Sequence, residues 1–194
     1  MASRAPVEKT QDMTDNPMFI PLIAQPLVLT TGARITMITT AITAVATGVL
    51  GGVFFAFSTS VMKALGRQPA AAAMTTMQAV NVSMVNPLFL TVLGGSTLAC
   101  LAILVSAPFV TAPHPGLRIA GALFFLVGAV GVTAVVNVPL NDALAAADPG
   151  SPPGVALWAD YLTRWTAYNH LRTACSVAAT VLLGLSTLRP GGAG

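Results

Sequence analysis

The sequence predicts an all-α fold, an integral membrane four-helix bundle with a short additional helix between the first two spans. The chain of 194 residues is 55% hydrophobic and only 8% charged, whereas soluble domains carry roughly 25% charged residues. Four of its uncharged stretches approach the roughly 20 residues that a helix needs to cross a bilayer. We therefore expect a multi-pass protein of the cell membrane.

The spans follow one another within a single domain. The second is expected to begin after Pro87, because proline suits the first turn of a helix. The helical pattern of the fourth extends back to about Trp158. The predicted spans are 35–57, 88–107, 119–136 and 173–188. The predicted organisation is a mobile or interfacial N-terminal segment over 1–33, a four-helix membrane domain over 34–189 and a tail over 190–194.

Small residues indicate how the spans pack. In the first span they recur every four positions, which predicts a stripe where a neighbouring helix approaches closely. Gly121 and Gly128 are expected to do the same in the third span. The stripe of the first span consists of Ala44, Gly48, Gly52 and Ala56.

Threading the chain through four spans places both termini and the loop 108–118 at one end of the bundle. The stretch 58–86 and the loop from Asn137 to about Trp158 lie at the other end, and most polar and aromatic side chains gather there. Lys and Arg number five at the terminal end and four at the other, so the positive-inside rule favours cytoplasmic termini. A functional site is expected at the second end.

The first candidate residues lie in the stretch from Met74 to Pro87, which is predicted to form the additional helix. Gln78 and Asn81 share a helical stripe with methionines, and unpaired amides are costly in an apolar setting. They either bond to neighbouring helices or hold a ligand's oxygen atoms, and the pattern favours neither. A copper(I) site made of methionines and His170 is an alternative, but its residues lack a regular ligand spacing.

The end of the third span supplies Asn137 and Asn141, on either side of Pro139. Asn and Pro commonly end a helix and start a turn, so a purely structural role would explain both asparagines. Because Asn137 directly follows an apolar run, we expect its amide to need partners near the membrane interface.

The fourth helix carries the most specific group. Trp165, Asn169 and Arg172 are spaced to share one helical face, where an aromatic plane, an amide and a permanent cation converge. That combination suits a flat, electron-rich ligand with an anionic oxygen, although Arg172 could also anchor the helix at the headgroups. The imidazole of His170 could act as a base, but it lies about 100° away around the helix.

Several other functions lack support in the sequence. The small net charge of +3 has no Lys/Arg block, which argues against nucleic-acid binding. Cys100 and Cys175 are isolated in apolar runs and are expected to pack rather than to bind metal or form a disulfide. The sequence contains no serine-triad, phosphate-loop, paired-carboxylate or HExxH pattern, so hydrolase and nucleotide chemistry are not expected.

An ordered set of short motifs resembles the anthrone oxygenase family of small membrane proteins. The set comprises GVFFAFSTSVMKAL, MQAVN, NP, NVPLN and RWTAYNHLRT, and the similarity extends from about Thr36 to Leu188. The resemblance implies an oxygenase that converts an anthrone-like aromatic polyketide to a quinone with O2, without a cofactor or a metal. Its implied partners are that aromatic substrate, O2 and membrane lipid.

The motif positions carried over from the family form the candidate site. We assign Arg172 to oxyanion stabilisation, Trp165 to stacking and His170 to proton abstraction. Asn169, together with amides of the additional helix, is expected to hold substrate oxygens. The motif positions are Ser58, Gln78, Asn81, Asn86, Asn137, Asn141, Trp165, Asn169 and Arg172.

Two other functions remain open on the sequence. The chain could be a non-enzymatic accessory or carrier protein, since polar clusters also form partner interfaces. It could instead be an oxidoreductase that uses a lipid quinone. No Asp or Glu lies within a span, which argues against a proton pump. Association into a homo-oligomer is equally open.

Overall fold

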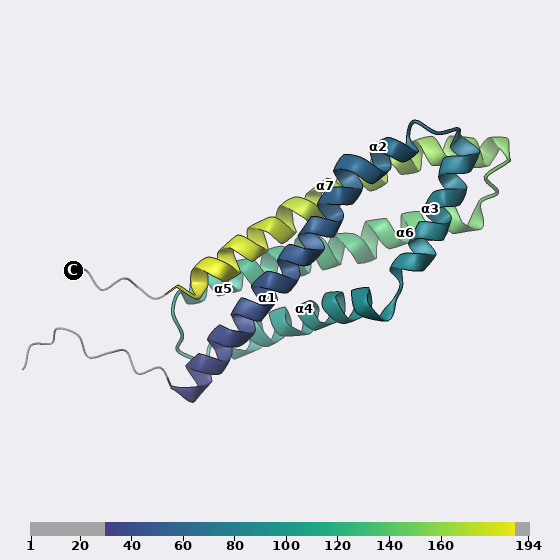
Figure 1. Cartoon of the computed structure of the whole chain (residues 1–194). Coiled ribbons are helices and arrows are strands. Elements are labelled where there is room, and N and C mark those ends of the chain that lie inside the picture. The colour runs from purple at the N-terminus through teal and green to yellow at the C-terminus, as the bar shows by residue number, and fades with distance from the viewer. Residues whose placement is uncertain (1–29, 189–194) are drawn as a thin grey trace, which may run out of the picture. The chain divides into compact units, whose positions relative to one another are not determined.

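The computed structural model describes residues 30–188, and every regular element in that part is helical, which confirms the predicted all-α class. The predicted segments 1–33 and 190–194 fall largely outside it. Figure 1 shows the order of the elements. They are α1 (Thr31–Ala56), the π-helical η2 (Phe57–Val61), α2 (Met62–Leu65), α3 (Ala70–Met84), α4 (Pro87–Ser106), α5 (Pro115–Leu123), the π-helical η3 (Phe124–Gly131) and η4 (Thr133–Asn137), α6 (Val138–Ala146) and α7 (Pro152–Ser186).

Three continuous helical stretches are long and apolar enough to cross a membrane. They are Thr31–Leu65, Pro87–Ser106 and Pro115–Ala146. α7 is longer than the predicted fourth span, but charged and polar side chains interrupt its first half. Membrane spanning is thus supported for three segments, and the fourth span remains a prediction. The short helix predicted between the first two spans is confirmed as α3.

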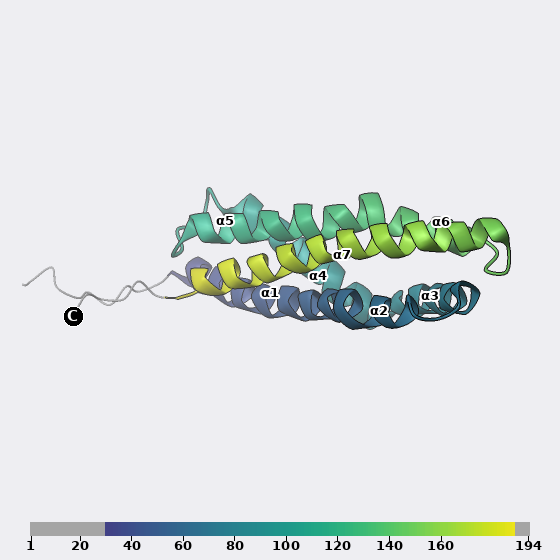
Figure 2. The ribbon, with the colours of Figure 1, turned by 90° about the horizontal axis from the view of Figure 1, so that it is seen from above.

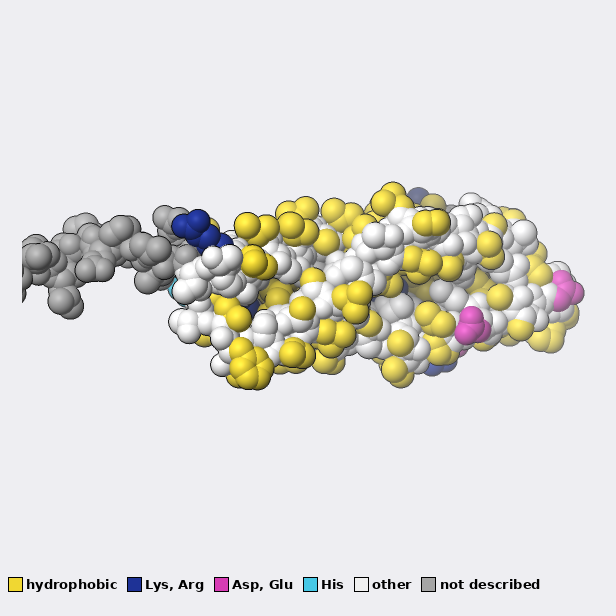
Figure 3. Space-filling model, turned by 90° about the horizontal axis from the view of Figure 1, so that it is seen from below, with side chains coloured by type: hydrophobic (Ala, Val, Ile, Leu, Met, Phe, Trp, Pro, Cys, Tyr) yellow, Lys and Arg dark blue, Asp and Glu magenta, His cyan; other side chains and the backbone are white. Residues whose placement is uncertain are grey.

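Large hydrophobic side chains are exposed along these segments. The exposed fractions are 65% for Ile42, 71% for Val105 and 68% for Val127. Figure 3 shows hydrophobic atoms along the middle of one face of the helical unit and acidic side chains near one end of it. So much exposed apolar surface is unfavourable in water and is expected where helices face lipid.

α7 lies at the centre of the helical unit. It packs against α1, α5 and η3, and its first half also contacts α3 and α6. Figure 2 shows α7 between a layer of α5 and α6 and a layer of α1, α2 and α3. α7 begins at Pro152, earlier than the predicted Trp158, because the Ser151 hydroxyl accepts the amide of Gly154 at 3.1 Å and caps the helix.

The predicted small-residue stripe of the first span is wrong in its second half. Ala44 is buried, but Gly52 and Ala56 are exposed. A four-residue repeat advances about 40° per step around an α-helix, so the stripe rotates away from the neighbouring helix. Gly51 faces α7 instead, since a Cβ built there would lie 3.1 Å from the Cβ of Ser176.

The third span also differs from prediction. The loop expected from Asn137 is helical as far as Ala146. The amide of Val138 donates to the carbonyl of Thr133, five residues earlier. This wide π turn stands directly before Pro139, whose missing N–H would otherwise disrupt an α-helix. The helix therefore continues and brings Asn141 onto the same element as the span.

Gly128 is expected to be essential for the packing of η3 against α7. A Cβ at Gly128 would lie 2.2 Å from Sγ and 2.4 Å from Cβ of Cys175. Gly128→Ala should therefore lower the free energy of unfolding by about 3 kcal/mol, a typical cost of overpacking. Thermal unfolding in detergent would measure the change.

The partner substitution provides the control for Gly128. Cys175→Gly removes both clashing atoms, so Gly128→Ala should cost less in that background than alone. Gly52→Ala is the matched neutral change, because no atom lies within 4 Å of a Cβ built there. Equal costs of Gly128→Ala in both backgrounds would contradict the close contact.

Candidate functional site

A cavity of about 190 Å³ lies between the helices at the end where the sequence places the site. Segments of α1, η2, α3, α4, η4, α6 and α7 surround it, and most of its wall is apolar. Arg172 is the one charged residue of the lining, so the cavity favours an uncharged or anionic ligand. Its polar lining residues are Asn81, Thr133, Asn137, Asn141, Asn169 and Arg172.

Arg172 and Asn169 form the deepest polar pair. The Arg172 guanidinium donates to Asn169 Oδ1 at 3.2 Å and lies 3.8 Å from the centre of the Phe54 ring. Asn169 Nδ2 donates at 2.7 Å both to the Phe54 carbonyl and to Ser58 Oγ. The cation is 5% exposed, and no carboxylate of the described part of the chain forms an ion pair with it. This cation is therefore held in place by an amide and an aromatic face.

Two buried polar atoms of residues that line the cavity have no partner within residues 30–188. They are Arg172 Nε, a donor, and Asn137 Oδ1, an acceptor. The other amide atom of Asn137 donates to the Trp165 carbonyl at 3.4 Å. Leaving a buried polar atom unpaired costs about 1 to 3 kcal/mol. Two residues that line the cavity, Arg172 and Asn137, thus carry one unused donor and one unused acceptor.

Asn141 organises the aromatic wall. Its Oδ1 accepts from the Tyr161 hydroxyl and from Trp165 Nε1, each at 2.9 Å. Asn81 Nδ2 donates to the same Tyr161 oxygen at 3.4 Å. The rings of Tyr161 and Trp165 stack with centres 6.2 Å apart. These bonds fix the Trp165 indole as a wall of the cavity.

Helix geometry explains how these side chains meet. Trp165, Asn169 and Arg172 are spaced by four and three residues, and all three are buried on one face of α7. In η2 the π-helical turn presents Ser58 to the same face. Six predicted site residues line the cavity: Asn81, Asn137, Asn141, Trp165, Asn169 and Arg172. Ser58 touches Asn169 but does not line the cavity itself.

Three predicted site residues, Gln78, Asn86 and His170, do not line the cavity. Gln78 donates to the carbonyls of Leu144 and Ala147 at 2.8 and 3.1 Å, and so ties α3 to the end of α6. Asn86 caps α4 by accepting the amide of Phe89 at 3.0 Å. Both side chains thus hydrogen-bond to the backbone. For Gln78 this is the bond to a neighbouring helix that the sequence left open as one of two roles.

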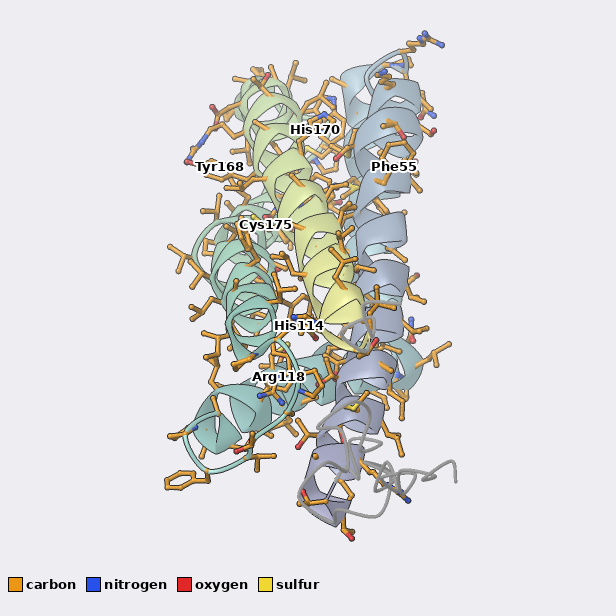
Figure 4. All side chains as sticks on the ribbon, turned by 90° about the vertical axis from the view of Figure 1, so that its left-hand side faces the viewer. Phe55, His114, Arg118, Tyr168, His170 and Cys175 are labelled. Carbon is orange, nitrogen blue, oxygen red and sulfur yellow. The ribbon has the colours of Figure 1, made fainter. Side chains whose placement is uncertain are left out.

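His170 is exposed and lines a separate cavity. Figure 4 shows it on the side of α7 that faces α1 and α2, whereas Tyr168 lies on another side of the helix. Its one-residue offset from Asn169 turns it about 100° away. No carboxylate, imidazole or amine lines the Arg172 cavity, so the geometry does not place His170 where it could act as the base.

Sequence reasoning did not select three residues that build the site. Tyr161 is one of the aromatic residues at this end, and its spacing of four from Trp165 is a signal that the sequence offers. Phe54 and Thr133 lie in apolar runs with no distinguishing pattern. Among the described residues, no group of three or more His, Cys, Asp or Glu side chains could hold a metal ion.

Comparison with known protein families matches residues 83–182 to the anthrone oxygenase family. The matched part includes most of the cavity-lining polar residues, from Asn137 to Arg172, and is shorter than the resemblance noted in the sequence. Neither the curated proteins nor the solved structures include a match. Because the family match covers more than half of the 194 residues, the chain belongs to the anthrone oxygenase family.

Proposed function

We propose that the protein is a membrane oxygenase that oxidises an anthrone-like aromatic compound to the quinone with O2. The observation that carries the proposal is a pair of unpartnered atoms on residues that line the cavity, Arg172 Nε and Asn137 Oδ1. An aromatic ketone with a neighbouring phenol supplies the complementary acceptor and donor. The indole of Trp165 offers a flat wall against which its rings can stack.

The reaction balances without another reductant. An anthrone loses a proton from its ring methylene and becomes an electron-rich anion whose charge lies largely on the carbonyl oxygen. The anion passes one electron to O2, and the two radicals combine to a peroxide at the former methylene carbon. This peroxide anion takes up a proton from water, and loss of a water molecule from the hydroperoxide gives the second carbonyl. Anthrone and O2 thus yield one quinone and one water.

The residues of the cavity act on the first step. Arg172 would bind the developing oxyanion through Nε, and Asn137 would accept the phenol hydrogen. A preorganised donor in an apolar site stabilises such an anion far more than water does. It thereby increases the acidity of the methylene, and the proton leaves to water because the lining holds no basic side chain.

The substrate is expected to enter from the lipid side. Val85 and Leu90 line the cavity and are 68% and 49% exposed. Both belong to the corner between α3 and α4, close to the start of a membrane-spanning segment. An apolar rim of this kind admits a flat aromatic molecule dissolved in the membrane.

Oxygen uptake tests the proposal. The purified protein in detergent, supplied with emodin anthrone, should consume one O2 for each quinone formed, at a rate well above autoxidation and unchanged by metal chelators. Heat-denatured protein is the blank. A rate equal to the blank, together with no binding of the anthrone, would exclude this function and favour the accessory or carrier role.

His170→Ala is expected to retain oxygen uptake within about twofold of the wild type, because surface changes away from a site have small effects. Its imidazole lies outside the Arg172 cavity. The measurement is the same uptake assay across neutral pH. A loss of about 100-fold, the usual contribution of general base catalysis, would instead identify His170 as the base.

A further inference from the structure

A second cavity, of about 520 Å³, opens between α2 and the first half of α7. We call it the α2–α7 groove. Lys63, Arg67 and His170 line it and are exposed, while Met62 and Leu162 form apolar parts of its wall. This is where His170 points in Figure 4. The groove and the Arg172 cavity have no lining residue in common. Ser58, which lines the groove, contacts Asn169 of the cavity.

The positive charge of the groove is not neutralised by the described residues. No Asp or Glu lines it. The ion pair found in the described part joins Arg164 to Asp160 at 3.1 Å, away from this lining. Lys63 and Arg67 therefore present two free cations and an imidazole to one concave surface, which is an arrangement suited to an anion.

One residue that lines the groove carries a buried hydroxyl without a partner. Thr166 Oγ1 makes no hydrogen bond to any residue that the structure describes. Thr163 and Thr173, on the same helix, donate to the carbonyls four residues before them at 3.1 and 2.9 Å. Thr166 does not make this bond. Its hydroxyl is thus available to donate to an oxygen bound between the two helices.

We propose that the α2–α7 groove binds a phosphate group, such as that of an anionic phospholipid. The cations of Lys63 and Arg67 would pair with the charge, and the Thr166 hydroxyl would donate to one oxygen. The apolar wall formed by Met62 and Leu162 favours a phosphate attached to an acyl chain. The groove lies at the end of the first membrane-spanning stretch, which runs to Leu65, and headgroups are expected at that level. This site does not depend on the proposed oxidation.

Native mass spectrometry of the full chain in detergent, titrated with phosphatidylglycerol, would test the groove. The double variant Lys63→Gln/Arg67→Gln should bind about 30-fold more weakly, since each basic residue near an anionic surface contributes roughly fivefold. Thr166→Val, which removes only the hydroxyl, should weaken binding about tenfold, as expected for a hydrogen bond to a charged group. Thermal unfolding checks that each variant is folded.

Arg34→Gln/Arg164→Gln is the matched control, because it removes the same charge from two exposed positions outside the groove. It should bind phosphatidylglycerol like the wild type. Equal weakening in both double variants, or wild-type binding by Thr166→Val, would overturn the proposal and indicate general attraction of anions. Displacement of the lipid by inorganic phosphate would identify a soluble phosphate as the ligand, and its retention would identify the headgroup.

Discussion

Replacement of Arg172 by glutamine is expected to lower kcat/KM for anthrone oxidation by about 100-fold to 1,000-fold, the usual effect of removing one donor to an oxyanion. Glutamine keeps an amide that can still bond to Asn169 Oδ1. It loses the cation and the unpartnered Nε of a residue that lines the cavity. Since Arg172 is the one charged residue of the lining, no other side chain can replace its charge.

Oxygen uptake at several anthrone concentrations measures this effect, and Arg164→Gln is the matched control on the same helix. Arg164 is exposed and paired with Asp160, so its loss should change uptake by less than about twofold. Arg172→Lys keeps the charge without the planar fork and should give an intermediate rate. A folded Arg172→Gln protein with wild-type kcat/KM would contradict the oxyanion role.

The periodicity of α7 made its part of the site predictable. The spacing of Trp165, Asn169 and Arg172 places them on one face of any α-helix, and the structure buries all three there. The same helical spacing places His170 about 100° from Asn169 around the helix, and His170 is exposed in the structure. Where the helix is regular and long, the sequence alone thus determined which side chains act together.

Contacts between helices could not be predicted in the same way. Nothing in the apolar run of the first span marks Phe54 as the residue under the guanidinium, because that depends on the rotation of α1 against α7. A strict four-residue pattern selected Gly52 because it advances about 40° per step around the helix, whereas Gly51 is the residue in contact with α7.

The hydrogen-bond partners of the amide side chains on α3 could not be predicted from the sequence either. Gln78 and Asn81 lie three residues apart on α3, yet one binds carbonyls of the α6 end and the other binds Tyr161 beside the cavity. The requirement that a buried amide be paired holds for both residues. It does not specify the partner, which depends on where α6 continues past Pro139.

Asn169→Leu is expected to lower the free energy of unfolding by about 3 to 5 kcal/mol, the cost of leaving a buried charged group without its partner. Leucine has a similar size but cannot donate to the Phe54 carbonyl and Ser58 Oγ or accept from Arg172. Thermal or chemical unfolding in detergent measures the loss. Ser58→Ala removes one of these bonds and should cost about 1 kcal/mol.

The double variant distinguishes a connected network from independent bonds. Once Asn169 is leucine, Ser58 has already lost this partner, so Ser58→Ala should then cost almost nothing. Full additivity would mean that the 2.7 Å bond between them contributes little. Because Asn169 also orients Arg172, Asn169→Leu should reduce anthrone oxidation, whereas Ser58→Ala, which leaves the bond between Asn169 and Arg172 intact, should retain most of it. Ser58→Ala would then lower stability with little effect on activity, whereas Asn169→Leu would lower both. The two residues belong to one chain of contacts that runs from α1 through Asn169 to Arg172.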